Sequence, residues 1–472
     1  MKPKRITRTT FLMGVGGAAA LAAFGARATA QAARPNVLLV LDDDHPPYMM
    51  DPMPVVRRRI RDVGVDLYNG AADIPLCGPA RVSVLTGLSV TTHRCDDNST
   101  YGDFRDSPLG LKERTVARFL KDAGYRTAHF GKYVNGKGPD GPPAPHWDRW
   151  CLIEGSGGGD SANQVNEDGE VYRIGGKPSM WAAARLADFV RNHAGGGPWF
   201  AQYCPTIPHA PYEPTPESEH LYDGADRDVP STNEGRMGDK PAWMRDLPKV
   251  ELEKIRRVIE GKKEELADLD RRCMKPVLDA LDGSGQLGNT VVFFTSDNGY
   301  MAGEHRLQQK DHPYWESAEV PFFARGPGVA SGARSLALVS HVDLAPTICE
   351  LAGVSPALLE ADGRSMVRGL SSGRFGPWRE RMLTSGSKDV GPEGGNPGGS
   401  NDPSGRWWLL AEGDKRFILR ENGAKELYWM GSDPYQNRSR HDDADPALIR
   451  RLTDTVEAMR RASGDERRAL ET

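Results

Sequence analysis

The 472-residue chain has no excess of charge of either sign. It holds 61 Lys and Arg against 65 Asp and Glu, which gives a formal net charge of -4 and a pI near 6.3. Such a balance lacks the broad basic surface with which proteins bind nucleic acid, so we expect no nucleic-acid partner. Any anionic ligand must be attracted by charges that are gathered locally.

Cysteine is scarce, and long apolar runs are nearly absent. The six cysteines lack the close spacing of structural zinc sites and are too few for a disulfide scaffold. One apolar run, over residues 11–26, follows four basic residues and precedes Ala-Thr-Ala. It is too short and too rich in small residues for a convincing membrane span. Residues 1–30 therefore predict a signal peptide of a secreted or periplasmic protein, without stable membrane insertion.

The route of export depends on a weaker pattern. Residues 7–12 read Thr-Arg-Thr-Thr-Phe-Leu and resemble a twin-arginine export motif, but Thr9 stands in place of the second arginine. We therefore expect export in general, with a degenerate twin-arginine signal as one form of it. An N-terminal membrane anchor is the alternative interpretation.

The stretch from Ile74 to Gly87 carries the most specific pattern. Pro79 suits the first turn of a helix, so we expect Cys77 at or just before a helix N-terminus and Arg81 one turn inside. Helix N–H groups and a guanidinium would then converge on a tetrahedral oxyanion, and the same field would activate a nucleophile at position 77. The alternative is a buried cysteine that only packs.

Residues 77–81 read Cys-Gly-Pro-Ala-Arg, and 85–87 read Leu-Thr-Gly. This pattern resembles the signature of the type I sulfatase family, in the alkaline phosphatase-like superfamily. The resemblance implies that a formylglycine-generating enzyme converts Cys77 to formylglycine. A hydrated aldehyde offers one hydroxyl to attack sulfur and a second whose deprotonation expels sulfate, which a thiol lacks.

Two apolar segments end in oxygen-bearing side chains. Residues 35–41 lead into 42–44, three aspartates, and 290–295 lead into Ser-Asp-Asn. Buried parallel strands place their chemistry at their carboxyl ends, although a helix cap or solvated turn could also explain the first triplet. Oxygen ligands from two strands suit calcium or magnesium. The family resemblance favours Ca²⁺, with Mg²⁺ less favoured, and matches these metal ligands: Asp43, Asp44, Asp297, Asn298 and the modified Cys77.

Three further positions match residues that handle the sulfate group in the family. Lys132 follows the expected strand 125–130, and Lys310 lies in a second lysine segment. The resemblance implies that both contact sulfate together with Arg81. His209, in Pro-His-Ala-Pro, is held between prolines after a strand, and the motif match makes it the candidate general acid.

One position departs from the family pattern. Many sulfatases carry a histidine two residues after the first lysine, whereas this chain has Val134. If that histidine deprotonates the formylglycine hydroxyl, another group must do so here. His305 and His312 are two candidates near Lys310, but the sequence does not identify the base.

The order of elements predicts an α/β fold with two parts. We expect a large mixed, mainly parallel sheet sandwiched by helices over residues 34–375, as in alkaline phosphatase-like proteins. A small C-terminal subdomain of antiparallel sheet plus helix should occupy 376–472. Expected helices cover 111–123, 179–193, 250–281, 342–351 and 446–462, and further strands cover 199–204, 322–324, 407–410, 417–419 and 426–429. Residues 138–178 read as a long irregular excursion.

These patterns together predict an exported sulfatase that hydrolyses sulfate esters. Residues 131–135, Gly-Lys-Tyr-Val-Asn, resemble the N-acetylglucosamine-6-sulfatase-like branch and favour a sulfated glycan over another sulfated small molecule. A phosphate or phosphonate monoester hydrolase of the same superfamily is one alternative. A catalytically silent, cation-dependent carbohydrate-binding protein is the other, if Cys77 is never modified.

Overall fold

The computed structural model describes residues 34–154, 163–386 and 403–472. Residues Pro35–Thr472 form one compact unit. The expected signal peptide, 1–30, lies outside the described residues. In the described ranges no helix combines the length and the apolar composition needed to cross a bilayer.

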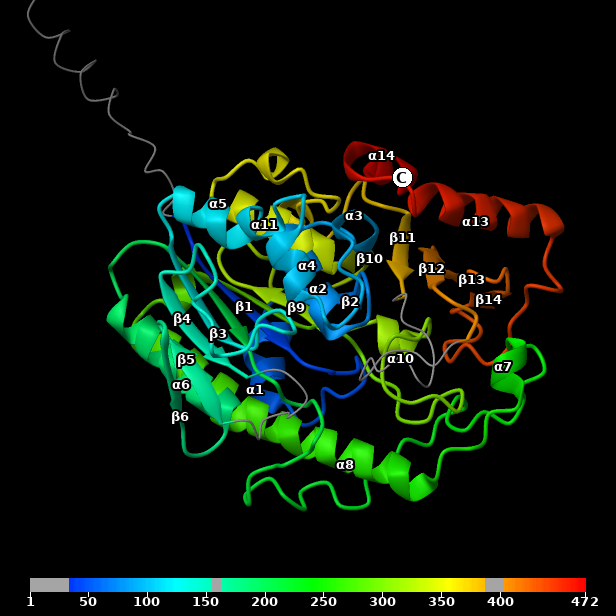
Figure 1. Cartoon of the computed structure of the whole chain (residues 1–472), viewed down its shortest axis with the longest axis horizontal. Helices are drawn as coiled ribbons and strands as arrows, with labels where there is room; N and C mark the ends of the chain where they lie inside the picture. Colours follow the sequence, from blue (N-terminus) through cyan, green and yellow to red (C-terminus); the bar gives the residue numbers. More distant parts are fainter. Residues whose placement is uncertain (1–33, 155–162, 387–402) are drawn as a thin grey trace, which may run out of the picture. The chain divides into compact units, whose positions relative to one another are not determined.

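A ten-stranded mixed sheet forms the centre of this unit (Figure 1). Its order is β10-β2-β9-β8-β1-β7-β3-β4-β5-β6. The central strands β8, β1, β7, β3 and β4 are parallel to one another, whereas β9 and β5 are antiparallel to their neighbours. The bounds are β1 Asn36–Asp42, β2 Val65–Ala71, β3 Arg126–Gly131, β4 Arg149–Ile153, β5 Gln164–Glu167, β6 Glu170–Arg173, β7 Trp199–Cys204, β8 Thr290–Ser296, β9 Phe322–Arg325 and β10 Ala333–Ser340.

Helices cover both faces of this sheet. Val37 and Leu39 of β1 pack on the side of α2, α5 and α11, and Leu38 and Val40 pack on the side of α6, α8 and α9. Burial on both faces explains the continuous apolar run of β1. The helices are α1 Pro54–Val56, α2 Cys77–Thr86, α3 Val90–His93, α4 Tyr101–Asp106, α5 Val116–Asp122, α6 Pro178–Asn192, α7 Ala242–Arg245, α8 Leu252–Asp268, α9 Lys275–Gly283, α10 Trp315–Ala318, α11 Leu344–Leu351 and α12 Val367–Ser372.

The C-terminal part forms a second, four-stranded antiparallel sheet. Its strands are β11 Arg381–Ser385, β12 Trp407–Glu412, β13 Lys415–Arg420 and β14 Lys425–Trp429, followed by α13 Pro446–Met459 and α14 Gly464–Leu470. One face packs on Leu452 and Val456 of α13, and the other packs on Met301 and Tyr314 of the larger part. Both faces are therefore covered, and the small sheet is anchored beside the loop that carries Lys310.

The expected fold class is confirmed, because helices enclose a mainly parallel sheet and a small antiparallel sheet with a helix follows. The expectation of an irregular excursion over 138–178 is wrong in part: β4, β5 and β6 extend the large sheet at this edge. Three of the four side chains of β6 are exposed, so β6 carries no clear apolar alternation, whereas β4 ends in four buried residues, Trp-Cys-Leu-Ile. Strand β11, Arg381–Ser385, is likewise absent from the strands that the sequence predicts.

Candidate active site and metal centre

The candidate metal ligands lie where two adjacent strands end. Asp42 of β1 and Ser296 of β8 are partners in the parallel register. The residues that follow them, Asp43 and Asp297, are therefore neighbours at the carboxyl edge of the sheet. The Asp44 N–H donates to Asp297 Oδ1 at 3.2 Å, which joins the two strand ends.

The donor atoms at this edge fit a hard divalent cation. Asp43, Asp44, Cys77 and His209 offer atoms that all lie within 4.8 Å of one another. Asn298 donates through Nδ2 to Asp44 Oδ1 at 2.7 Å, but its buried Oδ1 has no hydrogen-bond partner among the described residues. A buried acceptor left in this way costs free energy unless a cation or water satisfies it. Carboxylates with an amide oxygen are the ligands that Ca²⁺ and Mg²⁺ prefer.

Cys77 is the first residue of α2, and all ten residues of this helix are buried. The helix start is as expected, with Arg81 one turn inside. Burial, with the carboxylates of Asp297 and Asp43, raises the pKa of the Cys77 thiol far above its usual value. These surroundings favour the thiol form of the unmodified cysteine, and activation of a nucleophile at this position stays a prediction.

Arg81 and Lys132 converge on the same carboxylates from different elements. Arg81 Nη2 donates to Asp297 Oδ2 at 2.7 Å and to Asp43 Oδ2 at 3.2 Å. Lys132, which follows β3, donates to Asp43 Oδ2 at 2.6 Å. Burial alone would raise the pKa of Asp43, but Lys132, His209 and Arg81 hold it well below its usual value. These three cationic neighbours therefore favour the carboxylate form of Asp43.

Lys310 reaches the site from the loop between β8 and α10. Its Nζ donates to Asp44 Oδ1 at 2.5 Å and to Cys77 Sγ at 2.9 Å. The side chain is buried, and Asp44 raises its pKa well above the usual value against the opposing effect of burial. A charged ammonium group thus lies against the candidate nucleophile.

His209 lies in the loop after β7 and approaches Asp44 Oδ2, whereas Lys310 contacts Oδ1 of the same carboxylate. Its Nδ1 lies 2.6 Å from the Ala210 carbonyl oxygen, and its Nε2 lies 3.7 Å from Asp44 Oδ2. Nδ1 donates to that carbonyl, which turns Nε2 toward the cluster. Burial and Lys310 lower the pKa of His209. It is also the most exposed side chain of the cluster, at 26%.

The comparisons with known proteins now decide the family. The family model described as Sulfatase matches residues 41–354, which is most of the large sheet and its helices. The chain belongs to the sulfatase family. The resemblance to the sulfatase family is thereby confirmed.

Sulfatase relatives cover most of this chain. An extracellular sulfatase SULF-1 homolog of Drosophila melanogaster is 30% identical over 354 residues, which are 72% of this chain and 31% of that protein. The N-acetylglucosamine-6-sulfatase of Homo sapiens is 28% identical over 373 residues, which are 74% of this chain and 67% of that protein. This chain therefore spans about a third of the length of the fly protein and two thirds of the human one.

Solved structures share the fold at lower identity. A structure described as a complex with its substrate D-glucosamine-2-N,6-O-disulfate has a TM-score of 0.73 and 21% identity, and it covers 90% of this chain and 96% of that one. The phosphonate monoester hydrolase of Agrobacterium radiobacter has a TM-score of 0.70 and 19% identity over 90% and 96%. At this identity both confirm the fold alone.

Sequence reasoning missed one buried residue of this sulfatase-family site. Lys262 of α8 donates through Nζ to the carbonyl oxygens of Asp44 at 2.8 Å and Pro208 at 2.9 Å. Its ammonium group also lies 3.9 Å from the Tyr300 ring centroid, and burial lowers its pKa to about 8. The sequence does contain a sign of this role. Lys262 lies between Ile259 and Leu266 in the apolar stripe of the helix, where a lysine without a buried partner is very unfavourable.

The structure also places the residues around the family departure. Val134 is buried in the core on the α2 side of the sheet. His305 Nδ1 lies 2.6 Å from Glu234 Oε2, and His312 Nε2 lies 3.1 Å from the Gln308 carbonyl oxygen. These hydrogen bonds do not include Cys77, so neither histidine is brought to the nucleophile by them. The catalytic roles assigned to Arg81, Lys132, His209 and Lys310 stay predictions, now with a shared location.

Proposed function

We propose that this chain is a carbohydrate sulfatase that acts through a formylglycine derived from Cys77. The observation that carries the proposal is the convergence of three buried cationic groups on one sulfur atom and its carboxylate neighbours. Lys310 contacts Cys77 Sγ, while Arg81 and Lys132 contact Asp43, whose Oδ1 lies 3.3 Å from the same sulfur. Such a cluster matches the negative charge of a sulfate ester.

The charges of the site favour an anion once a divalent cation is bound. Arg81, Lys132 and Lys310 balance three of the four aspartates at the strand ends: Asp43, Asp44 and Asp297. Asp43, Asp44, Asp297 and Asn298 would hold the cation, for which we propose Ca²⁺ rather than Mg²⁺. The ion would add positive charge that stabilises sulfate oxygens and orients the nucleophile. A hydrated formylglycine would supply one hydroxyl for attack on sulfur and a second whose deprotonation releases sulfate.

The chain's own side chains would do the remaining work. Arg81, Lys132 and Lys310 would hold the sulfate oxygens and stabilise the charge that develops on them. His209 would donate its Nε2 proton to the departing alcohol oxygen. Burial and Lys310 lower the pKa of His209 when no substrate is bound. The negative charge of a bound sulfate ester would raise this pKa toward neutrality.

The proposed substrate is a sulfated amino sugar, free or within a glycan. Support comes from the N-acetylglucosamine-6-sulfatase relative and from the resemblance of residues 131–135 to that branch. We also propose that residues 1–30 direct export, that a formylglycine-generating enzyme acts during maturation, and that residues 34–375 and 376–472 are the catalytic and C-terminal parts. N-terminal sequencing of the exported protein tests the first of these.

Mass spectrometry of the tryptic fragment 62–81 tests the nucleophile directly. The fragment contains Cys77 and no internal Lys or Arg. We expect protein from its native host to carry an aldehyde in place of the thiomethyl group and to release sulfate from N-acetylglucosamine 6-sulfate. An unmodified thiol in protein that binds this sugar without turnover would contradict the proposal and favour the carbohydrate-binding alternative.

A phosphonate or phosphate monoester hydrolase is the second candidate, because the fold is shared with the Agrobacterium enzyme. Matched phenyl sulfate, phenyl phosphate and phenyl phosphonate esters separate the two. We expect the highest kcat/KM for the sulfate, because the three cationic groups are balanced by three carboxylates before the metal binds. A higher kcat/KM for either phosphorus ester would overturn the sulfatase assignment.

A further inference from the structure

A second basic site lies between the large part and the small sheet. Four of the eight residues that line a cavity of about 660 Å³ are arginines, and one is an aspartate: Arg94, Arg406, Arg460, Arg461 and Asp96. We call this cavity the arginine pocket. Its volume is in the range of small-molecule sites. In a chain whose net charge is -4, four guanidinium groups around one cavity are a local excess that the composition does not predict.

The carboxylates near the arginine pocket do not balance its guanidinium groups. Arg406 pairs with Asp96. Arg460 and Arg461 share a single oxygen of Glu457, at 2.7 and 2.5 Å. Arg94 is exposed, and its guanidinium has no ion pair or hydrogen bond with any residue in the described ranges. Within the described residues, the side chains of two carboxylates, Asp96 and Glu457, thus pair with three of the four guanidinium groups, and Arg94 is left to contact a ligand.

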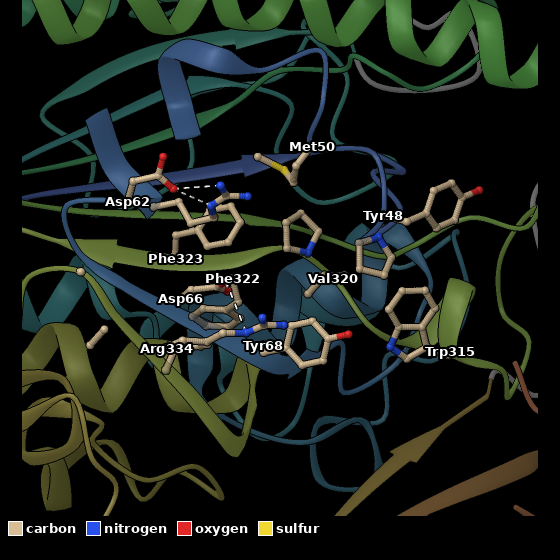
Figure 2. Close-up of a pocket in the computed structure, with 16 residues that line it drawn as sticks. Tyr48, Met50, Asp62, Asp66, Tyr68, Trp315, Val320, Phe322, Phe323 and Arg334 are labelled. Atoms are coloured by element: carbon tan, nitrogen blue, oxygen red, sulfur yellow. Dashed lines mark hydrogen bonds and ion pairs between the residues drawn. The ribbon is translucent and has the colours of Figure 1, made fainter. Parts of the chain in front are cut away.

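A larger cavity of about 710 Å³ shows that such an excess is not a general property of this surface (Figure 2). Its two arginines are each matched by an acid. Arg61 lies 2.8 Å from Asp62 Oδ1, and Arg334 lies 3.9 Å from Asp66 Oδ2 while its guanidinium covers the ring of Tyr68. This cavity is electrically balanced, whereas the arginine pocket is not.

The geometry of the guanidinium groups suits oxyanions. A guanidinium presents a planar fork of donors that matches tetrahedral sulfate, and it is more weakly hydrated than an ammonium group. The Arg460 guanidinium lies over the ring of the buried Trp408, 4.5 Å from its centroid, and this contact helps to hold the arginine side chain in place. Arg94 and Arg461 are exposed and can adjust to a ligand.

One loop connects the arginine pocket to the candidate active site. Asp96 lines the pocket, and two residues later Asn98 accepts a hydrogen bond through Oδ1 from the Gly78 N–H at 3.1 Å. Asp96 and Asn98 are two residues apart, so their Cα atoms are separated by about 7 Å at most. Gly78 follows Cys77, so the pocket and the nucleophile lie at the two ends of one short connection.

We propose that the arginine pocket binds a second sulfate group of the same glycan chain whose first sulfate reacts at Cys77. The inference rests on the proposed function for its substrate class, because a polysulfated glycan carries anionic groups on neighbouring sugars. The arginine pocket then selects chains with more than one sulfate, while the active site alone accepts a single sulfated sugar.

A binding experiment without catalysis tests the pocket independently of the proposed activity. Both arms use Cys77→Ala protein, which cannot turn over the probe, with fully sulfated maltohexaose as the probe and maltohexaose as the uncharged control. We expect Arg94→Ala/Arg461→Ala to raise the Kd for the sulfated probe at least about tenfold at 150 mM salt. Arg334→Ala, which removes an exposed arginine from the balanced cavity, is the matched control and should change the Kd less than about twofold.

The outcomes separate this proposal from the proposed function. An unchanged Kd in the double variant, with an unchanged melting temperature, would overturn the pocket assignment whether or not the protein is a sulfatase. Equal affinity for a single-stranded oligonucleotide with as many charges would overturn the glycan assignment. In active protein, the double variant should raise KM for a polysulfated oligosaccharide about tenfold and leave kcat and the KM for N-acetylglucosamine 6-sulfate unchanged.

Discussion

The candidate active site and the arginine pocket both gather cationic side chains, but they do so in opposite ways. Arg81 and Lys132 are 2% and 3% exposed, and each is held against Asp43. Arg94 is exposed and has no carboxylate partner in the described ranges. Buried cations need paired carboxylates to offset their desolvation, and the pairs fix their geometry. Exposed cations keep their water and can stay unbalanced, so they offer charge without a fixed position.

Because of this difference, we expect the two sites to have different functions. A buried, paired cluster can stabilise charge at one defined point, which is what a transition state requires. An exposed, unbalanced cluster attracts many arrangements of anionic groups, with modest free energy from each. The predictions below alter one region at a time and compare the effect on the other.

Replacing the nucleophile should give the largest effect. We expect Cys77→Ala to lower kcat for N-acetylglucosamine 6-sulfate by at least about 10⁴-fold, because the step that forms the covalent intermediate is lost. Binding of sulfated maltohexaose at the arginine pocket should persist. Steady-state kinetics and calorimetry measure the two effects. Retention of more than a hundredth of the turnover would refute the role of Cys77.

His209→Ala should produce the next largest effect, and one that depends on the substrate. We expect about 10²- to 10⁴-fold slower turnover of sugar sulfates, whose alcohol leaves poorly without a proton. Turnover of 4-nitrophenyl sulfate should fall much less, because its phenolate needs no acid. A leaving-group series gives the comparison. Equal losses across the series would point to a positioning role in place of acid catalysis.

The same contrast between buried and exposed positions explains which parts of the fold and of the site are predictable from the sequence. The buried strands β1, β7 and β8 are mainly apolar, and the segments that follow them carry the site residues Asp43, His209 and Asp297, so both are predictable. The short strands β5 and β6 at the edge of the sheet have no such pattern. The pKa of the Cys77 thiol is not predictable from its own segment, because it depends on Asp43 and Asp297, which approach from other elements.

The two missed features have different causes. Lys262 breaks the apolar stripe of α8, so its burial is visible in the sequence, but its partners, the carbonyl groups of Asp44 and Pro208, are not. The arginine pocket joins residues near position 94 with residues near 406 and 460. No local pattern connects segments that distant, and only the packing of the small sheet against the large part brings them together.

Lys262→Met should affect the active site and leave the arginine pocket unchanged. The change keeps the length of the side chain but leaves the carbonyl oxygens of Asp44 and Pro208 without their donor, which should cost about 3 kcal/mol of unfolding free energy. Calcium affinity and kcat for a sugar sulfate should both fall, because these carbonyls belong to Asp44, a proposed metal ligand, and to Pro208, the residue before His209. Urea unfolding and calcium titration measure this. Unchanged calcium affinity would limit Lys262 to a role in stability.

Asp73 provides a test of the buried connection between the two regions. Its Oδ2 accepts hydrogen bonds from Val90 N–H, beside the arginine pocket, and from Ser83 of α2. Burial raises its pKa from 3.8 to about 6. The folded state therefore binds the proton more tightly, and this stabilisation is present below about pH 4 and is lost as the pH rises to about 6. The loss amounts to about 3 kcal/mol. Asp73→Asn should remove this pH dependence from urea unfolding, whereas parallel curves for both proteins would contradict it.

Salt should give the smallest effect and the sharpest contrast. Exposed ion pairs contribute about 0.2 to 1 kcal/mol each and are screened over roughly 8 Å at physiological ionic strength. Raising NaCl from 20 to 300 mM should therefore weaken binding of sulfated maltohexaose to Cys77→Ala protein by about tenfold, and the effect should largely disappear in the Arg94→Ala/Arg461→Ala background. The KM for N-acetylglucosamine 6-sulfate should change much less, because Arg81, Lys132 and Lys310 are shielded from salt by burial. If the Kd for sulfated maltohexaose and the KM for N-acetylglucosamine 6-sulfate depended equally on salt, the two regions would act through one common electrostatic field. The proposed difference between buried, fixed charges and exposed, adaptable charges would then be wrong.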